Sequence, residues 1–268
     1  MKHNLIGLSG KMGSGKDTVA LMIQYLLWEK RVPSVDRFSN YIDTGSFRIK
    51  KFGGKLKQIA AILLGCEEED FEDRDFKNKE LGPEWTVYDL LYETEYEDVW
   101  HTHNKIFLTE NDALDYEEDN RLRGIGLQER RLTPRLLLQL LGTECGRQII
   151  HPNVWVYALF ADYHPEIIIE PISEENKAKY PVGFAPDIQQ RKEYPNWLIT
   201  DMRFPNELAA VKEKGGLTIR VNLIGKEDTG DHPSETALDD AEFDVVINCE
   251  FGLDKLLDEV INILPLIV

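Results

Sequence analysis

One glycine-rich stretch near the start of the chain, Gly7 to Thr18, constrains the fold more than any other feature. It reads GLSGKMGSGKDT and follows a short apolar run from Leu5 to Leu8. After it comes a largely apolar segment from Val19 to Trp28. The run predicts a buried first strand, and the segment predicts a buried helix. A strand, a glycine turn and a helix in this order indicate an α/β domain.

The spacing inside this stretch matches half of a phosphate-binding loop. Gly10, Gly15 and Lys16 form the pattern G-x-x-x-x-G-K, with Gly13 and Ser14 inside it. Such glycines let backbone N–H groups turn inward around an anion, and the positive end of the following helix points to the same place. Lys16 then carries the charge that reaches the β- and γ-phosphates. We therefore expect a nucleotide site here, because a plain glycine turn would leave the buried strand and Lys16 unexplained.

The two residues after the lysine depart from the usual loop. Ser or Thr normally comes first and binds Mg²⁺ through its hydroxyl, whereas this chain has Asp17 first and Thr18 second. A carboxylate binds metal directly or through water, and Thr18 lies about 100° further round the helix. Asp17 also suits a helix N-terminus simply as a negative charge. A metal role and this structural role both stay open.

The charge balance restricts the partners. The chain of 268 residues has a net charge of −17 and no lysine- or arginine-rich block. Long-range electrostatics therefore oppose a nucleic-acid polymer or an anionic membrane, but not a small phosphate ligand. No signal pattern or membrane-length apolar run is seen, and the three cysteines are scattered, which argues against a disulfide framework or a zinc cluster. We expect a cytoplasmic protein.

A second anion site is predicted after a short strand at Phe47 to Phe52. Gly53 and Gly54 open a helix there, and Lys55 and Lys57 lie in its first turn. Lysine is unfavourable at that end of a helix for the dipole alone. Paired glycines with lysines therefore favour anion binding, with two solvated lysines as the alternative.

A leucine-rich helix is predicted from Thr133 to Gly142. Thr133 suits the N-cap, proline follows it, and Gly142 is expected to end the helix. Arg135 and Gln139 are four residues apart and so share one face, and Arg147 follows shortly after. Arginine binds a phosphate or carboxylate through two parallel bonds. We expect ligand contact, with an internal ion pair as the alternative.

Two other stretches read as irregular. Residues 101–131 combine an acidic patch with several arginines, and residues 163–196 contain five prolines in a mostly polar context. We expect residues 163–196 to form an irregular insertion that leaves the core.

Regular structure is predicted again near the C-terminal third. A buried strand from Trp197 ends at Asp201, and Asn206 is expected to cap the next helix. Further strands at 217–223 and 245–247 precede a closing amphipathic helix. Alternating strands and helices predict a parallel sheet with helices on both faces. The phosphate loop, Asp201 and Arg203 then lie at one sheet edge.

With these parts placed, the chain resembles the phage-type deoxynucleoside monophosphate kinases of the P-loop nucleoside monophosphate kinase superfamily. The matching segments are GKMGSGKDT at 10–18, KLK at 55–57, TPRLLLQLLGTECGR at 133–147, TDMRFPNE at 200–207, HPSE at 232–235 and VINCEFGLDKLL at 246–257. The order of the first, third and fourth segments is the most specific part. Asp17 after the lysine is shared with this family, and it separates the chain from generic ATPases.

The resemblance implies a single P-loop kinase domain over residues 1–268, with an inserted helical acceptor-binding region at about 47–160. The implied reaction moves the γ-phosphoryl group of ATP to a deoxynucleoside 5′-monophosphate, with Mg²⁺ as cofactor. The chain departs from the family at Gly53 and Gly54. Its loop at 225–236 also lacks the arginine-rich lid typical of many such kinases, which leaves Arg203 or an acceptor-region arginine to neutralise the transition state.

The resemblance also implies roles for individual residues. The catalytic set is Lys16, Asp17, Asp201 and Arg203. The ATP-binding set is Gly10, Gly13, Ser14, Gly15, Lys16, Asp17, Thr18 and Asn248, with Asn248 near the adenine. The monophosphate-binding set is Lys55, Lys57, Arg135, Gln139, Arg147, Asn206 and Glu207. The metal-binding set is Asp17, Thr18 and Asp201.

Two other functions stay open from the sequence. One is another small-molecule P-loop kinase, such as a dephospho-coenzyme A kinase-like enzyme, and the other is a regulatory module that uses ATP as a switch. The switch predicts no basic second site, so Arg135, Gln139 and Arg147 argue against it. The accepted bases and the oligomeric state, with a homodimer among the options, are not fixed by the sequence.

Overall fold

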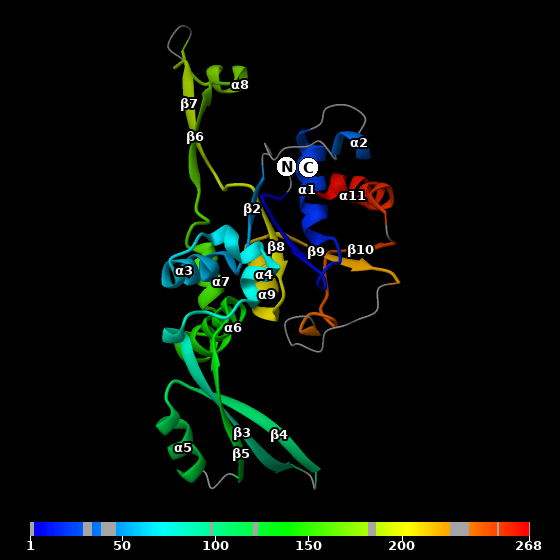
Figure 1. The fold of residues 1–268 in the computed structure, drawn as a ribbon. Helices are drawn as coiled ribbons and strands as arrows, with labels where there is room; N and C mark the ends of the chain where they lie inside the picture. The colour runs from blue at the N-terminus through cyan, green and yellow to red at the C-terminus, as the bar shows by residue number, and fades with distance from the viewer. Residues whose placement is uncertain are drawn as a thin grey trace. The chain divides into compact units, whose positions relative to one another are not determined.

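The computed structural model describes residues 3–28, 34–38, 47–96, 99–119, 123–181, 186–225, 236–250 and 252–267 (Figure 1). The chain divides into two compact units. Unit 1 combines Met1–Lys55 with His151–Val268, and unit 2 is Leu56–Ile150. A single domain with an acceptor-binding region at about 47–160 stays a prediction.

The centre of unit 1 is a five-stranded parallel sheet with the order β10-β9-β1-β8-β2. The strands are β1 (Leu5–Ser9), β2 (Arg48–Lys50), β8 (Trp197–Met202), β9 (Leu217–Leu223) and β10 (Val245–Cys249). All residues of β1 are buried, as the opening apolar run predicts. The predicted α/β class with a parallel sheet is confirmed.

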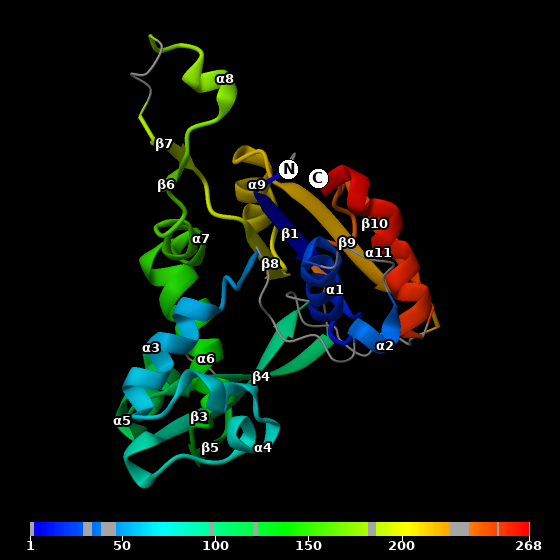
Figure 2. The ribbon, with the colours of Figure 1, turned by 90° about the horizontal axis from the view of Figure 1, so that it is seen from above.

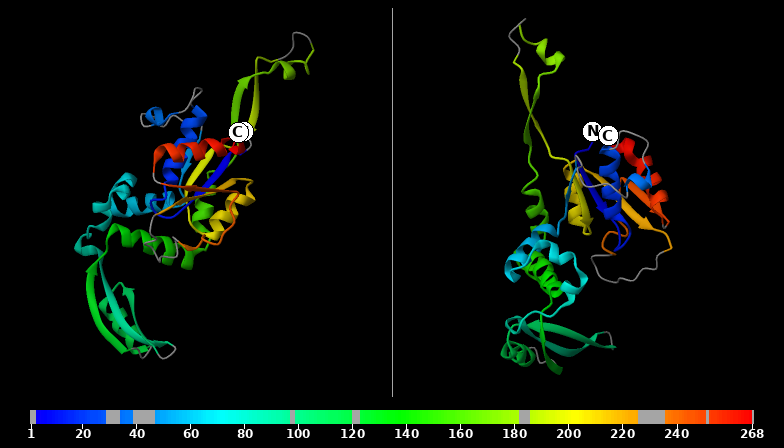
Figure 3. Two further views of the ribbon diagram at one scale, coloured as in Figure 1. Left: turned by 90° about the vertical axis from the view of Figure 1, so that its right-hand side faces the viewer. Right: turned by 45° about the horizontal axis from the view of Figure 1, so that its top comes forward.

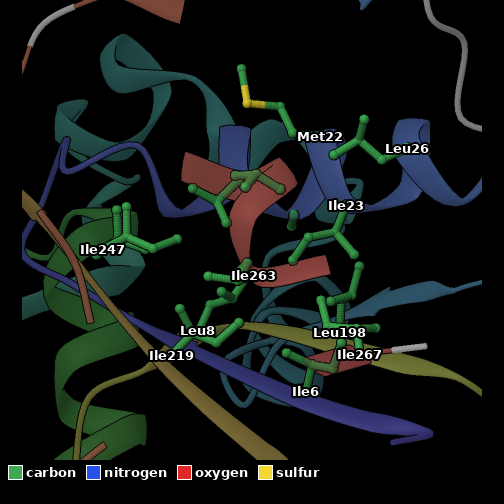
Figure 4. Packing of buried hydrophobic residues seen from close by; sticks show 14 of the residues in the cluster. Ile6, Leu8, Met22, Ile23, Leu26, Leu198, Ile219, Ile247, Ile263 and Ile267 are labelled. Carbon is green, nitrogen blue, oxygen red and sulfur yellow. The ribbon is translucent and has the colours of Figure 1, made fainter. Parts of the chain in front are cut away.

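Helices cover both faces of this sheet (Figure 2). On one face, α1 (Lys16–Trp28) and α11 (Leu253–Ile267) pack against β1, and Figure 4 shows Ile6, Ile23 and Ile263 in the same apolar cluster. On the other face, α7 (Val154–Phe160) and α9 (Pro205–Glu213) form a second cluster with Leu5 and Trp197. Because side chains alternate along a strand, the adjacent residues Leu5 and Ile6 of β1 pack into the clusters on opposite faces of the sheet.

Two strands within residues 163–181 and 186–196 pair antiparallel, so the prediction of irregular structure is wrong for these paired residues. β6 (Glu166–Pro171) and β7 (Ile188–Glu193) pair antiparallel, with α8 (Glu174–Lys177) between them in the chain. Figure 3 shows the pair as a two-stranded ribbon separate from the parallel sheet. Pro171 is the last residue of its strand, where a missing N–H group is tolerated.

The helices of unit 2 surround a small apolar cluster. Phe71 is fully buried there with Ala60, Ala61 and Leu137. The contributing elements are α3 (Gly54–Leu64), which begins in unit 1, the 3₁₀-helix η1 (Glu68–Glu72), α4 (Arg74–Asn78) and α6 (Pro134–Gln139). A 3₁₀-helix, η2 (Pro83–Trp85), leads from these helices into a sheet.

This sheet is antiparallel, and the described residues 101–107, 110–119 and 123–131 lie in strands or a helix, so the prediction of irregular structure is wrong for them. Its order is β4-β3-β5, with β3 (Thr86–Tyr96), β4 (Val99–Phe107), α5 (Glu110–Asp119) and β5 (Arg123–Arg131). The acidic α5 packs through a fully buried Ala113 and a Phe107–Tyr116 ring contact of 5.3 Å. Backbone pairing between the strands therefore stabilises this sheet although its sequence is rich in polar residues.

The leucine-rich helix continues past Gly142, which corrects its predicted end. The Thr133 hydroxyl accepts from the Leu136 N–H group at 3.2 Å, and Pro134 begins α6, both as predicted. A π-helix, η3 (Leu140–Ile150), follows directly. Gly142 is buried within it, and a Cβ atom there would lie 3.0 Å from a Leu56 methyl group. This glycine therefore serves close packing rather than helix termination.

Among the described residues, no helix is long and apolar enough to cross a membrane.

Asp244 gives the stability of unit 1 a defined pH dependence. Its Oδ2 accepts from the Thr218 N–H group at 2.8 Å and from the Thr218 hydroxyl at 2.6 Å. Burial raises the pKa of Asp244, but the two bonds from Thr218, aided by Lys212 and His3, outweigh burial and hold the pKa below its usual value. This stabilisation is therefore complete at neutral pH and is lost as the pH falls through the folded-state pKa.

We expect Asp244→Asn to lower the free energy of unfolding at pH 7 by about 0.5–1 kcal/mol, a value limited by solvent screening. The difference from wild type should shrink as the pH falls below the ordinary aspartate pKa of about 3.9, and it should vanish once the folded-state carboxyl is protonated as well. Urea unfolding at several pH values measures it, with the exposed Glu242→Gln as control. A difference that does not change with pH would contradict the role given to Asp244.

Candidate functional site

The glycine loop lies between the end of β1 at Ser9 and the start of α1 at Lys16. Gly13 and Gly15 have φ values of 73° and 91°, in the left-handed region that favours glycine. A Cβ atom on Gly10 would lie 2.4 Å from the Ser14 hydroxyl oxygen and 2.5 Å from the Val221 carbonyl oxygen. All three glycines of the motif are therefore required by this backbone, and the predicted strand, loop and helix are confirmed.

Two side chains of the loop fit a phosphate group. The Ser14 hydroxyl is buried and has no hydrogen-bond partner among the described residues. Lys16 is only 7% exposed, and its Nζ lies 3.5 Å from the Lys11 carbonyl oxygen within the same loop. A buried hydroxyl is rarely left without a partner, and a phosphate oxygen at the N-terminus of α1 would supply one.

Two of the predicted metal-binding residues, Asp17 and Thr18, lie in α1 directly after the glycine loop. Asp17 is in the first turn of α1 with an exposed side chain, and Thr18 is partly buried. In the described part of the chain, no three His, Cys, Asp or Glu side chains gather as a metal cluster. Mg²⁺ in kinases is usually held by one or two carboxylates together with substrate phosphates. A metal role for Asp17, Thr18 or Asp201 stays a prediction.

Asp201 lies beside the loop because β8 is parallel to β1, with Met202 opposite Ser9. Its carboxylate accepts from the Phe52 N–H group at 2.7 Å and the Gly53 N–H group at 2.9 Å. Burial raises the pKa of Asp201, against the lowering effect of these two bonds and of Arg203. The backbone N–H group of Gly53 thus binds the Asp201 carboxylate of this protein.

The two lysines of the predicted second anion site each have an acidic partner. Lys55 Nζ lies 2.9 Å from Asp162 Oδ2 in unit 1, and Lys57 Nζ lies 2.5 Å from Glu72 Oε1 in unit 2. The bond from Lys55 lowers the pKa of Asp162. Surface pairs of this kind are weak, so they do not prevent exchange for a phosphate, and the acceptor role of both lysines stays a prediction.

Arg135 belongs to a basic group in unit 2. Its side chain is exposed, and its Nε donates to the neutral Asn78 amide oxygen at 2.9 Å. Burial lowers the pKa of Lys77 in α4; Glu72 opposes this effect, and the nearby cations Lys57, Arg135 and Arg74 add to it. Lys77 was not predicted from the sequence, because a lone lysine beside acidic residues forms no recognisable motif.

The other predicted acceptor residues of unit 2 follow on the same helix. Gln139 is exposed at the end of α6. Arg147 is partly buried in η3, and its Nη1 donates to the Gly142 carbonyl oxygen at 3.2 Å. Their binding roles stay predictions.

Glu207 fixes the turn that carries Arg203, whereas Asn206 contacts a different segment. Phe204 rather than Asn206 is the N-cap of α9, so the predicted cap is wrong. Asn206 instead donates to the Asn153 side-chain oxygen at 2.8 Å. Glu207 is 2% exposed, and its Oε2 accepts from the N–H groups of Arg203 at 2.8 Å and Phe204 at 3.1 Å. Direct contact of Asn206 or Glu207 with a monophosphate stays a prediction.

A buried arginine beside the loop was also not predicted from the sequence. Arg220 lies in β9 opposite Ser9, and its Nη1 donates to the Ser9 hydroxyl at 3.0 Å. Its Nη2 lies 2.6 Å from Asp239 Oδ1. The available signal was a lone cation inside the apolar strand LTIRVNL. Asn248, predicted near the adenine, accepts from Asn222 at 2.9 Å, while HPSE at 232–235 and Phe251 lie outside the described residues.

The chain is similar to the deoxynucleoside-5′-monophosphate kinase of Escherichia phage T5. The two are 28% identical over 255 residues, which cover 87% of this chain and 84% of the phage protein. No protein-family model matches the chain. The resemblance inferred from the motifs is confirmed by this match, and the fold is an α/β P-loop kinase fold.

Glu207→Ala should destabilise the protein by about 1–3 kcal/mol, because two backbone N–H groups at a helix start lose their acceptor. Glu207→Gln keeps one acceptor oxygen and should lose less. Chemical denaturation measures both variants, and Glu213→Ala, an exposed change in the same helix, is the matched control. If Glu207→Ala is no less stable than this control, the carboxylate does not cap α9.

Proposed function

We propose that the protein transfers the γ-phosphoryl group of ATP to a deoxynucleoside 5′-monophosphate. The observation that supports this most is the glycine loop, where a buried Ser14 hydroxyl without a described partner and a buried Lys16 flank the N-terminus of α1. The match to the phage T5 enzyme over most of both chains supports the choice of acceptor.

Phosphoryl transfer requires positioning and charge neutralisation more than a strong base. In the proposed reaction the backbone N–H groups of the loop hold the ATP phosphates, and Lys16 neutralises charge on the transferred group. Arg203, whose backbone is fixed by Glu207, stabilises the charge that develops during transfer. Mg²⁺, when bound with ATP, supplies further charge neutralisation on the phosphates; Asp17, Thr18 and Asp201 are the residues proposed to hold it.

The proposed acceptor-binding residues are Arg135, Gln139 and Arg147 in unit 2, with help from Lys57. Arg135 is exposed and donates to a neutral amide, so its guanidinium keeps donors that can bind a phosphate. The phosphate oxygen that attacks ATP is already ionised at neutral pH. No separate general base is therefore needed, and the proposed acceptor site accordingly contains cations that bind the phosphate.

A coupled ADP-release assay over a panel of deoxy- and ribonucleoside monophosphates tests the reaction. We expect ADP release to depend on the acceptor and on Mg²⁺, and Lys16→Ala to reduce kcat/KM by at least about a thousandfold. Lys192→Ala, an exposed lysine on the β6–β7 hairpin, should behave like wild type. ADP release that no acceptor changes would favour an ATP switch, and a response only to dephospho-coenzyme A would favour the other kinase class.

Arg135→Ala should raise the KM for the monophosphate about ten- to hundredfold, because a charge-assisted bond to phosphate is lost. The KM for ATP should stay near the wild-type value. Arg191→Ala, which removes an exposed arginine paired with glutamates in β6 and β7, is the matched control in unit 1. An unchanged monophosphate KM in Arg135→Ala removes this residue from the acceptor site.

A further inference from the structure

Arg220 is a charged side chain in an apolar part of unit 1. It is 8% exposed, whereas its neighbours Ile219 and Val221 belong to the cluster under α1 and α11. Burial of a guanidinium is costly unless its donors are satisfied. Its partners therefore show what the side chain holds in place.

The first partners lie at the entry to the glycine loop. Nη1 donates to the hydroxyl of Ser9, the last residue of β1, and Ser9 is 1% exposed. Nη2 binds Asp239 Oδ1 at 2.6 Å, and the other oxygen of Asp239 lies 3.1 Å from Lys11 Nζ. Lys11 is the first side chain of the loop after Gly10. One carboxylate thus joins a buried strand cation to a loop cation.

Asp239 is itself held in position. Leu238, next to it, is 2% exposed in the cluster on the opposite face of the sheet, with Trp197 and Met202. The Asp239 N–H group donates to the Thr236 carbonyl oxygen at 3.0 Å, which closes a turn. The carboxylate is therefore presented from an anchored segment, 236–241.

A second branch of bonds leaves Arg220 toward the other end of the proposed ATP site. Its Nε lies 3.4 Å from Asn222 Oδ1, and Asn222 Nδ2 donates to Asn248 Oδ1 at 2.9 Å. Asn248 is exposed and is the residue assigned to the adenine region. A continuous series of polar contacts therefore runs from Lys11 through Asp239, Arg220 and Asn222 to Asn248.

We propose that Arg220 is a positioning residue for ATP, which with Asp239 sets the geometry of the glycine loop at Lys11 and, through Asn222, orients Asn248. This inference rests on the proposed ATP site. Arg220 acts through Ser9, Asp239 and Asn222, and it makes no contact with the nucleotide in this role. A planar guanidinium suits the role because it binds three acceptors in fixed directions.

The experiment measures ATP affinity by calorimetry without an acceptor, followed by steady-state kinetics and thermal unfolding. The variants are Arg220→Lys, which keeps the charge but loses the fork, and Asp239→Asn, which keeps a similar shape but loses the charge. Thr218→Val is the matched control. It removes a hydroxyl bonded to Asp244 at the start of the same strand β9, away from Ser9 in register.

We expect Arg220→Lys and Asp239→Asn to weaken ATP binding and raise the KM for ATP about ten- to hundredfold. The KM for the monophosphate should stay within about twofold of wild type. Thr218→Val should lower the melting temperature while ATP affinity stays unchanged.

Wild-type ATP affinity in both Arg220→Lys and Asp239→Asn overturns the proposal. So does a loss of affinity that follows the melting temperature equally in all three variants, because Arg220 would then be only structural. If wild type binds ATP but phosphorylates no monophosphate, the proposed reaction fails, and the ATP affinities still decide the role of Arg220. If wild type binds no ATP, both proposals fail.

Discussion

The burial of β1 between two parallel neighbours is the constraint on which the site depends. Its backbone pairs with β8 on one side and β9 on the other, and both of its faces are covered by helices. A strand held on every side cannot shift its register without exposing apolar side chains. The chain therefore leaves the sheet at Ser9, with Met202 and Arg220 beside it. Segments far apart in sequence meet there because of pairing alone.

The local charge at this point differs from the charge of the whole chain. The protein carries a net charge of −17, yet Lys16 and Arg220 are buried at or beside the loop. Screening limits exposed charges to a range of about 8–10 Å at physiological salt. A long polyanion would meet the acidic surface as a whole, whereas a phosphate group at the proposed site would meet only the loop. The negative net charge therefore disfavours large anionic partners, but it does not disfavour a small anion that contacts only the loop.

The sequence predicted the parts of unit 1 in which backbone geometry and residue type are tightly linked. Gly10, Gly13 and Gly15 were recognisable because no other residue fits their backbone. The cap of α9 was misplaced although Pro205 marked the first helical position, which makes the preceding residue, Phe204, the cap. Proline at the first turn was therefore a stronger signal than a nearby asparagine.

Unit 2 was harder to predict because its order comes from pairing between strands rather than from an apolar period. β3 pairs on both edges, so its backbone bonds are satisfied although its sequence is rich in polar residues. The π-helix η3 was missed for a different reason. Gly142 reads as a helix end from sequence, but here its missing side chain admits Leu56. Local propensity cannot separate these two uses of glycine.

The buried charge of Arg220 is better explained by the groups it holds in place than by a gain in folding stability. Replacing a buried ion pair with apolar residues of similar volume is often neutral or stabilising. An apolar side chain at 220 would match Ile219 and Val221, but it would leave the Ser9 hydroxyl and one Asp239 oxygen without this donor. Asp239 would then bind Lys11 from a less defined position. The structural benefit of the arginine is thus a fixed loop entry, and stability alone gives no reason for a cation at this place.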